Sequence, residues 1–134
     1  MATGVRSFWH FTLPNHARAI FASCEMLAGD SDVYGRGIYF TDVGPPTSRS
    51  IISQACWNDW RASQMLAYIR VDEPSFQLSR PDHRRRNLWV VREPVLALNR
   101  ERFWLGEWEF AGPPSRAQAA PGQWKVPVLR SGCP

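Results

Sequence analysis

Two short segments in the first third of the chain carry the side chains best suited to chemistry. The first is Trp9-His10-Phe11-Thr12, and the second runs from Tyr34 to Asp42 and reads YGRGIYFTD. An imidazole and a hydroxyl two residues apart on an extended segment point to the same side. Both can hydrogen-bond the hydroxyl groups of a sugar. We therefore predict a polar binding surface on a strand that contains His10 and Thr12.

The second segment has the composition of a tight turn followed by a strand. Gly35 and Gly37 have no Cβ atom, so the backbone can bend sharply there and can approach a ligand closely. Tyr39 then offers an aromatic face on which a flat ring can stack. Asp42 closes the segment with a carboxylate.

Several familiar catalytic signatures are missing from the sequence. It contains no G-x-S-x-G, no G-x-x-x-x-G-K-[ST], no G-x-G-x-x-G and no H-E-x-x-H. Hydrolase, nucleotide triphosphatase and zinc peptidase functions therefore lose support. The three cysteines, Cys24, Cys56 and Cys133, are an odd number at wide spacing, which argues against both a disulfide scaffold and a zinc site. We expect a domain that folds without such covalent or metal links.

The basic residues are almost all arginine. The chain carries a formal charge of +4, and Lys125 is the single lysine among its 16 basic residues. This bias fits either a GC-rich genome or the recognition of phosphates, which the planar guanidinium grips in a bidentate manner. The run from Arg84 to Arg86 is accordingly either a solvated loop or a patch that contacts nucleic-acid phosphates. The tryptophans are either sheet core or platforms for unpaired bases.

The pattern of apolar residues predicts the elements that position these groups. The length of 134 residues favours one domain, 1–134. We predict a helix that begins at Pro14 and ends before Gly29, with Leu27 on its apolar face, and a second helix capped by Thr47 or Ser48. Strands are predicted at 6–12, 38–41, 65–72, 87–92, 95–98 and 103–110, with a last edge strand at 124–129 interrupted by Pro127.

Helices early in the chain and strands late in it are typical of an α+β protein with sheets packed on one another. The longest apolar runs are only a few residues, so we expect no membrane span. The N-terminus has no apolar region of the kind found in secretory signal peptides. We therefore expect a cytoplasmic location, with delivery into a target cell by a secretion system as the alternative.

The two motifs together resemble those of the ADP-ribosyltransferase fold. In that fold an aromatic-His-x-[Ser/Thr] strand and a [Tyr/Phe]-Gly-x-Gly-[Ile/Val]-Tyr-[Phe/Leu] strand form the nicotinamide pocket. The Thr41-Asp42 pair, the Pro-rich break and the later Tyr-Ile-Arg-Val-Asp strand are similar to the toxin or effector branch with a His-Tyr-Asp signature. The resemblance covers about residues 6–110 and leaves a Pro/Gly-rich extension, 111–134. It implies two packed β-sheets, a few helices and an NAD cleft between the sheets.

The resemblance also implies an activity. The protein would be an NAD-dependent mono-ADP-ribosyltransferase, a toxin or effector that cleaves the nicotinamide–ribose bond and needs no metal. His10 would anchor the ribose, the backbone of Phe11 would hold the carboxamide, Tyr39 would stack on nicotinamide and Arg36 would meet the diphosphate. The implied catalytic residues are His10, Tyr39 and Asp42, and the implied NAD-binding residues are His10, Phe11, Thr12, Gly35, Arg36, Gly37 and Tyr39.

The catalytic carboxylate is where the sequence departs from the poly(ADP-ribose) polymerases. Cleavage of the glycosidic bond passes through an oxocarbenium-like transition state, which a nearby carboxylate stabilises. The strand that carries the polymerase glutamate best matches Asn87-Leu88-Trp89-Val90-Val91, where leucine stands at the glutamate position. Transfer of a single ADP-ribose, or hydrolysis of NAD, is therefore expected rather than chain elongation. Asp42 is the first candidate for the carboxylate, with Asp72, Glu107 and Glu109 as alternatives.

Two other functions stay open at this point. If water attacks the ribose, the enzyme is an NAD glycohydrolase, and if catalysis has been lost, the domain is a module that binds nucleic acid or ADP-ribose. The acceptor of a transferase would be RNA, DNA or protein. A toxin would also be expected, by analogy, to have an immunity protein as partner, and we expect no membrane partner.

Overall fold

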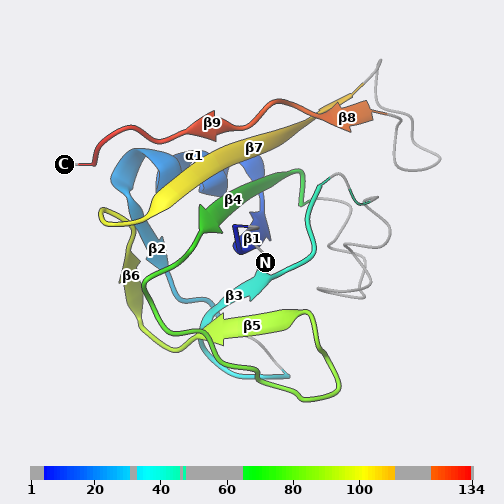
Figure 1. The fold of residues 1–134 in the computed structure, drawn as a ribbon, viewed down its shortest axis with the longest axis vertical. Helices are drawn as coiled ribbons and strands as arrows, with labels where there is room; N and C mark the ends of the chain where they lie inside the picture. Colours follow the sequence, from blue (N-terminus) through cyan, green and yellow to red (C-terminus); the bar gives the residue numbers. More distant parts are fainter. Residues whose placement is uncertain (1–4, 31–32, 46, 48–64, 111–121, 134) are drawn as a thin grey trace.

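The computed structural model describes residues 5–30, 33–45, 47, 65–110 and 122–133. These residues form a central antiparallel sheet with the strand order β5-β3-β1-β4-β7-β8, and β9 also pairs with β7 (Figure 1). A second sheet has two strands, β2 (Glu25–Leu27) and β6 (Val95–Ala97). The strands of the central sheet are β1 (Ser7–Thr12), β3 (Ile38–Thr41), β4 (Ala67–Asp72), β5 (Leu88–Val91), β7 (Arg102–Phe110), β8 (Gly122–Trp124) and β9 (Val128–Leu129).

The described residues are mostly β, with one helix, so the α+β class predicted from the sequence agrees with the structure at that coarse level. The predicted strands are confirmed to within two residues at their ends. Pro127 separates β8 from β9, as expected for a residue that has no N–H to donate. The predicted second helix lies outside the described residues apart from Thr47. No helix in the described ranges is both long enough and apolar enough to cross a membrane.

The helix α1 (Pro14–Ser23) begins where the sequence predicted and ends earlier. Pro14 occupies the first turn, where a missing N–H costs nothing. Cys24 has a left-handed backbone (φ 61°), and its N–H donates to the carbonyl of Ile20 at 2.8 Å, which stops the helix. The chain continues as β2, paired with β6. The prediction that Leu27 lies on an apolar helix face was therefore wrong, and this side chain is 72% exposed.

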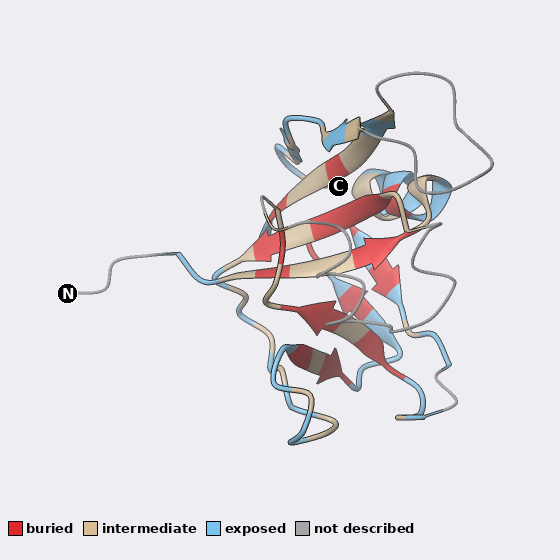
Figure 2. Ribbon diagram, turned by 90° about the vertical axis from the view of Figure 1, so that its right-hand side faces the viewer, coloured by how far each residue is buried: buried red, intermediate tan, exposed pale blue. Residues whose placement is uncertain are grey.

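The main core lies between the central sheet and α1. Phe8, Phe40 and Ile69 project from β1, β3 and β4 towards Ala17 of α1, and Met26 of β2 joins them. Figure 2 shows the buried residues gathered on the central strands, with exposed residues in the surrounding loops. Burying each large apolar side chain contributes about 1.5–3 kcal/mol. The second sheet thus shares a core with the first, which agrees with the expectation of packed sheets.

A smaller aromatic cluster covers the other side of the central sheet. Phe11 and Tyr68 are buried there, with ring centroids 5.6 Å apart, and Trp124 of β8 lies 5.2 Å from Tyr68. Gly106 of β7 is opposite Tyr68. This position needs a glycine, because a Cβ there would lie 2.0 Å from the Tyr68 ring. The part of the predicted C-terminal extension that the structure describes is therefore a component of the sheet and its packing.

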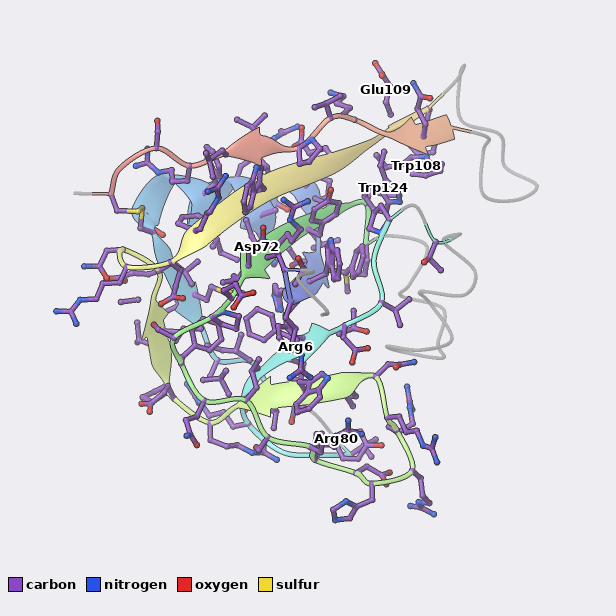
Figure 3. The ribbon with its side chains drawn as sticks, in the orientation of Figure 1. Arg6, Asp72, Arg80, Trp108, Glu109 and Trp124 are labelled. Carbon is purple, nitrogen blue, oxygen red and sulfur yellow. A yellow bond between two sulfur atoms is a disulfide. The ribbon has the colours of Figure 1, made fainter. Side chains whose placement is uncertain are left out.

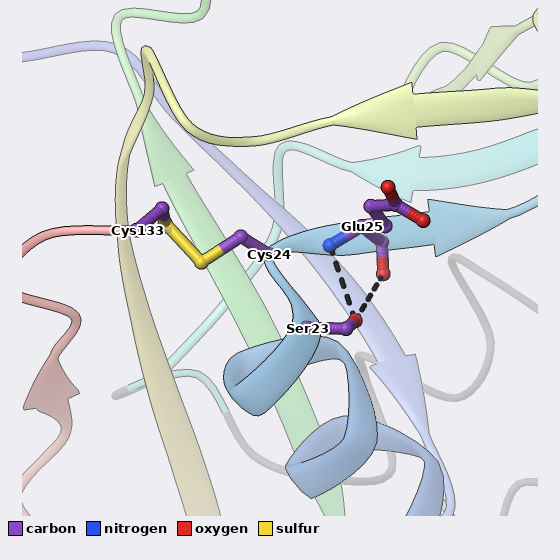
Figure 4. Close-up of a disulfide and its surroundings, with 4 residues drawn as sticks. All are labelled: Ser23, Cys24, Glu25 and Cys133. Atoms are coloured by element: carbon purple, nitrogen blue, oxygen red, sulfur yellow. Dashed lines mark hydrogen bonds between the residues drawn. A yellow bond between two sulfur atoms is a disulfide. The ribbon is translucent and has the colours of Figure 1, made fainter.

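A disulfide joins Cys24 to Cys133 across 109 residues of sequence (Figure 4). The expectation that the cysteines form no disulfide was wrong. Spacing could not reveal this bond, because two tertiary features bring the cysteines together. The left-handed residue that ends α1 places one of them, and the pairing of β9 with β7, continued by the bond from Arg130 N–H to the Phe103 carbonyl at 2.9 Å, places the other.

Loss of this disulfide is predicted to destabilise the fold. Replacing Cys133 by serine frees the unfolded chain from a loop of more than 100 residues, so the free energy of unfolding should fall by about 2–5 kcal/mol. Urea unfolding of the oxidised protein and of Cys133→Ser measures the difference. Reductant should lower the stability of the wild type to that of the variant and should leave the variant unchanged. Equal stability of the two oxidised proteins would contradict the bond.

Candidate functional site

His10 lies where the pairing between two neighbouring strands stops. β1 is registered with β4 along all six of its residues, whereas its register with β3 consists of one pair, Trp9 opposite Thr41. Beyond that pair, the two strands are connected by the imidazole of His10. Its Nδ1 lies 2.7 Å from the carbonyl oxygen of Tyr39. If Nδ1 carries the proton and donates to this carbonyl, Nε2 is left as an acceptor for a ligand hydroxyl.

The surroundings of His10 favour its neutral form. Its ring centroid is 5.8 Å from that of buried Phe40. Burial lowers the pKa of His10 below the usual 6.5, and the charge of His16 adds slightly to this effect. The hydrogen bond to the Tyr39 carbonyl acts in the opposite direction but is the weaker influence. A lowered pKa favours the uncharged imidazole at neutral pH, in which one ring nitrogen can accept a hydrogen bond.

Thr12 and Phe11 lie on opposite sides of β1. Thr12 is opposite Ala67 and His10 is opposite Ile69, and both of these partners belong to the core that faces α1. The prediction that His10 and Thr12 share a face is therefore confirmed. The ring of Phe11 faces the other way, into the aromatic cluster. Its side chain has a packing role, and the suggested contact of its backbone with a carboxamide stays a prediction.

The Gly35–Gly37 loop folds back on Tyr39. Gly35 has a left-handed backbone (φ 83°), which glycine adopts without strain. Its carbonyl accepts a hydrogen bond from the Tyr39 hydroxyl at 2.5 Å. A Cβ at Gly37 would lie 2.6 Å from Cγ2 of Val90 on β5. Gly35 is thus favoured by its backbone conformation and Gly37 is required by packing, whatever else approaches them.

Arg92 holds this loop closed, a role that no pattern in the sequence indicated. Its Nη1 donates to the carbonyl of Arg36 at 2.8 Å and to the Tyr39 hydroxyl at 3.3 Å. Its guanidinium carbon is 6.0 Å from the centroid of the Tyr39 ring. Arg92 follows β5 directly, and β5 pairs with β3, so only the strand pairing brings the two residues together. Arg36 itself is exposed, and its carbonyl is the atom used here.

Tyr34 connects the same loop to the arginine run. Its hydroxyl donates to Asp82 Oδ2 at 3.0 Å. Burial, and then this carboxylate, raise the pKa of Tyr34. The N–H of Arg84, at 2.9 Å, is the main cause of a lowered pKa at Asp82. The run that begins at Arg84 is therefore anchored beside the Gly35–Gly37 loop by one acidic residue.

Asp42 follows β3 and meets a tryptophan rather than the histidine. The Nε1 group of Trp89 donates to Asp42 Oδ2 at 3.1 Å. The guanidinium carbons of Arg6 and Arg80 lie 5.1 and 4.5 Å from the Trp89 ring centroid, and both arginines are labelled in Figure 3. The sequence left Trp89 either as part of the sheet or as a platform for an unpaired base. In the structure the Trp89 ring also contacts the guanidinium groups of two arginines, and its Nε1 group bonds Asp42.

The other candidate carboxylates lie on strands farther from Tyr39. Glu107 of β7 is bound by Arg18 of α1, with Nε 2.6 Å from Oε1. Glu109 is opposite Gln123 of β8, near the end of the sheet where Figure 3 shows Trp108 and Trp124. Asp72 is at the far end of β4, where it accepts from Ser7 Oγ at 2.6 Å. The fold thus places His10 of β1 against the backbone of Tyr39 on β3, leaves Asp42 just after β3 on Trp89, and places the other three carboxylates on β4 and β7.

Comparison of the chain with protein-family models, with curated proteins and with solved structures finds no match. Within the described ranges, no group of three or more histidine, cysteine or acidic residues could hold a metal ion.

Gly37 and Gly29 form a matched pair for testing the packing of the loop. The two residues hydrogen-bond each other through their backbones, at 2.9 and 3.0 Å. A Cβ at Gly37 meets Val90, whereas a Cβ at Gly29 meets nothing within 4 Å. Gly37→Ala should therefore lower the free energy of unfolding by about 1–3 kcal/mol, and Gly29→Ala should leave it nearly unchanged. Denaturant unfolding of both variants provides the measurement, and equal losses would refute the assigned packing.

The lowered pKa of His10 predicts a pH-dependent stability. Between pH 6.5 and the lower pKa of the folded state, the unfolded chain binds a proton that the folded protein does not. Stability should therefore fall as the pH falls through this window, by at most about 1.4 kcal/mol per pH unit. His10→Gln should remove this contribution, and a substitution of exposed His83 by glutamine serves as control. Unfolding free energies measured from pH 7.5 to 5.0 test it, and an unchanged slope in His10→Gln would contradict the assignment.

Proposed function

We propose that this protein is an NAD-dependent mono-ADP-ribosyltransferase with an ADP-ribosyltransferase-like fold. The observation that carries the proposal is the junction of β1 and β3. There His10 bonds the backbone of Tyr39, and the aromatic ring of Tyr39 stands beside a glycine-rich turn. These are the residues that the motif resemblance names, and they come together from segments 29 residues apart in sequence.

In the proposed reaction, NAD is the substrate and the chain supplies its binding groups. His10 Nε2 accepts a hydrogen bond from a ribose hydroxyl, and the Tyr39 ring stacks on nicotinamide. The bond between ribose C1′ and the nicotinamide nitrogen breaks, and its electron pair leaves with nicotinamide, which departs uncharged. A nucleophile of the acceptor then bonds to C1′ and loses its proton. Asp42 is the carboxylate proposed to stabilise the cationic transition state.

Arginines around this junction suit the diphosphate and the acceptor. Arg6 and Arg80 lie over Trp89, whose indole donates to Asp42. Stacking on an aromatic ring holds a guanidinium in place and leaves its N–H edges available to a phosphate. Arg36 is exposed on the loop beside Tyr39. These cations support an anionic substrate and favour an RNA, DNA or acidic protein acceptor; an immunity protein as a further partner rests on analogy alone.

One observation favours a second candidate, a binding module without catalysis. Asp42 Oδ2 already accepts a hydrogen bond from Trp89, and that bond reduces the charge available to a cationic transition state. A module of this kind would keep the arginines for ligand binding and would not consume NAD.

Release of nicotinamide from NAD, followed by NMR, tests the proposal. The wild type should release nicotinamide, and His10→Ala and Tyr39→Ala should each reduce the rate by about a hundredfold or more. Asp42→Asn keeps an acceptor for Trp89 and removes only the charge, so a loss of similar size would assign the carboxylate. Exposed His83→Ala is the control.

The acceptor is tested in the same assay by adding a cell lysate. Release that requires lysate indicates transfer to a macromolecule, and release in buffer alone indicates glycohydrolase activity. If the folded wild type releases no nicotinamide under either condition, the enzyme assignment is wrong and the binding module is favoured.

A further inference from the structure

An open pocket lies where β4 ends and β7 begins, at the Ser7 end of β1. Its volume is about 560 Å³, which is within the range of small-ligand sites. Three arginines, Arg70, Arg100 and Arg102, line it together with Trp104. The pocket is on different residues from the junction of His10 and Tyr39, so its ligand has to be inferred separately.

The sheet register builds a cationic platform in this pocket. Arg70 is opposite Trp104, and Asp72 is opposite Arg102, so these four side chains share one face of the sheet. The guanidinium carbon of Arg70 lies 4.0 Å from the Trp104 ring centroid, and that of Arg102 lies 5.0 Å from it. Contact with the indole orders each guanidinium and leaves its donor edges accessible.

The carboxylates of the pocket are held by the chain's own donors. Asp72 accepts from Ser7 and lies 3.1 Å from Arg70 Nε. Glu101 accepts from the N–H of Ser75 at 2.9 Å and from its hydroxyl. Among the described residues, no carboxylate forms an ion pair with Arg100 or Arg102, although both are exposed. Two cations are therefore available to a ligand.

A third carboxylate at the rim sits on strained backbone. Glu73 has φ 47°, a left-handed value that is costly for a residue other than glycine. Two hydrogen bonds to the Arg6 backbone hold it there. The Glu73 N–H donates to the Arg6 carbonyl at 2.8 Å, and the Arg6 N–H donates to Glu73 Oε1 at 3.2 Å. This geometry fixes the carboxylate of Glu73 at the mouth of the pocket.

The mixture of charges indicates the kind of ligand. Three arginines and three carboxylates give the pocket no net charge, so it is poorly suited to a bare anion. It suits a molecule that has a phosphate at one end and hydroxyl or amino donors at the other. We propose that the pocket binds a ribonucleotide unit, free or within an RNA strand. The phosphate would meet the forks of Arg100 and Arg102, and sugar or base donors would meet the remaining lone pairs of Glu73 and Glu101.

Titration with uridine 5′-monophosphate tests this site without NAD. Uridine shares no base with NAD, and the indole N–H signals in NMR spectra report binding near Trp104. Arg102→Ala should weaken binding about tenfold or more, which is the loss expected for one charge-assisted contact. Arg100→Ala should do the same. Arg18→Ala removes an exposed arginine of α1 that faces Glu107 rather than this pocket, so it should not change the affinity.

A short single-stranded oligouridylate, titrated in parallel, distinguishes the two sources of the nucleotide. Tighter binding of the oligonucleotide than of the mononucleotide, with the same sensitivity to Arg102→Ala, indicates RNA, and the reverse order indicates a free nucleotide. Inorganic phosphate that binds as tightly as the nucleotide would overturn the proposal, as would tighter binding of a phosphoserine peptide. Unchanged affinity in folded Arg102→Ala and Arg100→Ala, or no binding of either uridine probe, would also overturn it. None of these outcomes depends on whether the protein cleaves NAD.

Discussion

The hydrogen bond between the His10 imidazole and the Tyr39 carbonyl is the contact on which the candidate site depends. It stands where β1 and β3 cease to be registered with each other, so a side chain rather than a backbone ladder fixes their separation. A backbone pair between β1 and β3 would leave no group free at this point. An imidazole in the same position keeps its second nitrogen for a ligand. Burial lowers the pKa of that imidazole and so favours its neutral form. The same contact therefore serves the fold and supplies the property that the proposed reaction needs.

The hydroxyl end of the Tyr39 side chain is held by other residues of the protein. Gly35 accepts its hydroxyl hydrogen, Arg92 donates to its oxygen, and Val90 leaves no space for a side chain at Gly37. A ring held in this way loses little conformational entropy when a flat ligand stacks on it. The glycine-rich turn is thus explained by packing within the protein, and its use in ligand binding would be an addition to that role.

The arginines are organised by tryptophans at two separate places. Arg6 and Arg80 lie over Trp89, and Arg70 and Arg102 lie over Trp104. Both platforms hold cations next to carboxylates, so the net charge of +4 does not describe the local charge at either of them. The disulfide adds a constraint of another kind. Such a bond persists in an oxidising compartment and is reduced in a reducing one.

Local sequence was sufficient for elements whose signals are short-range. The alternation around His10 and the position of Pro14 defined a strand and a helix start, because period-two patterns and proline geometry act within a few residues. Tertiary structure decided the features that join distant segments. The pairing of β3 with β5 brings Arg92 to Tyr39 and Trp89 to Asp42, and the pairing of β9 with β7 carries Cys133 to Cys24. Strand order depends on the burial of whole faces, which no local pattern encodes.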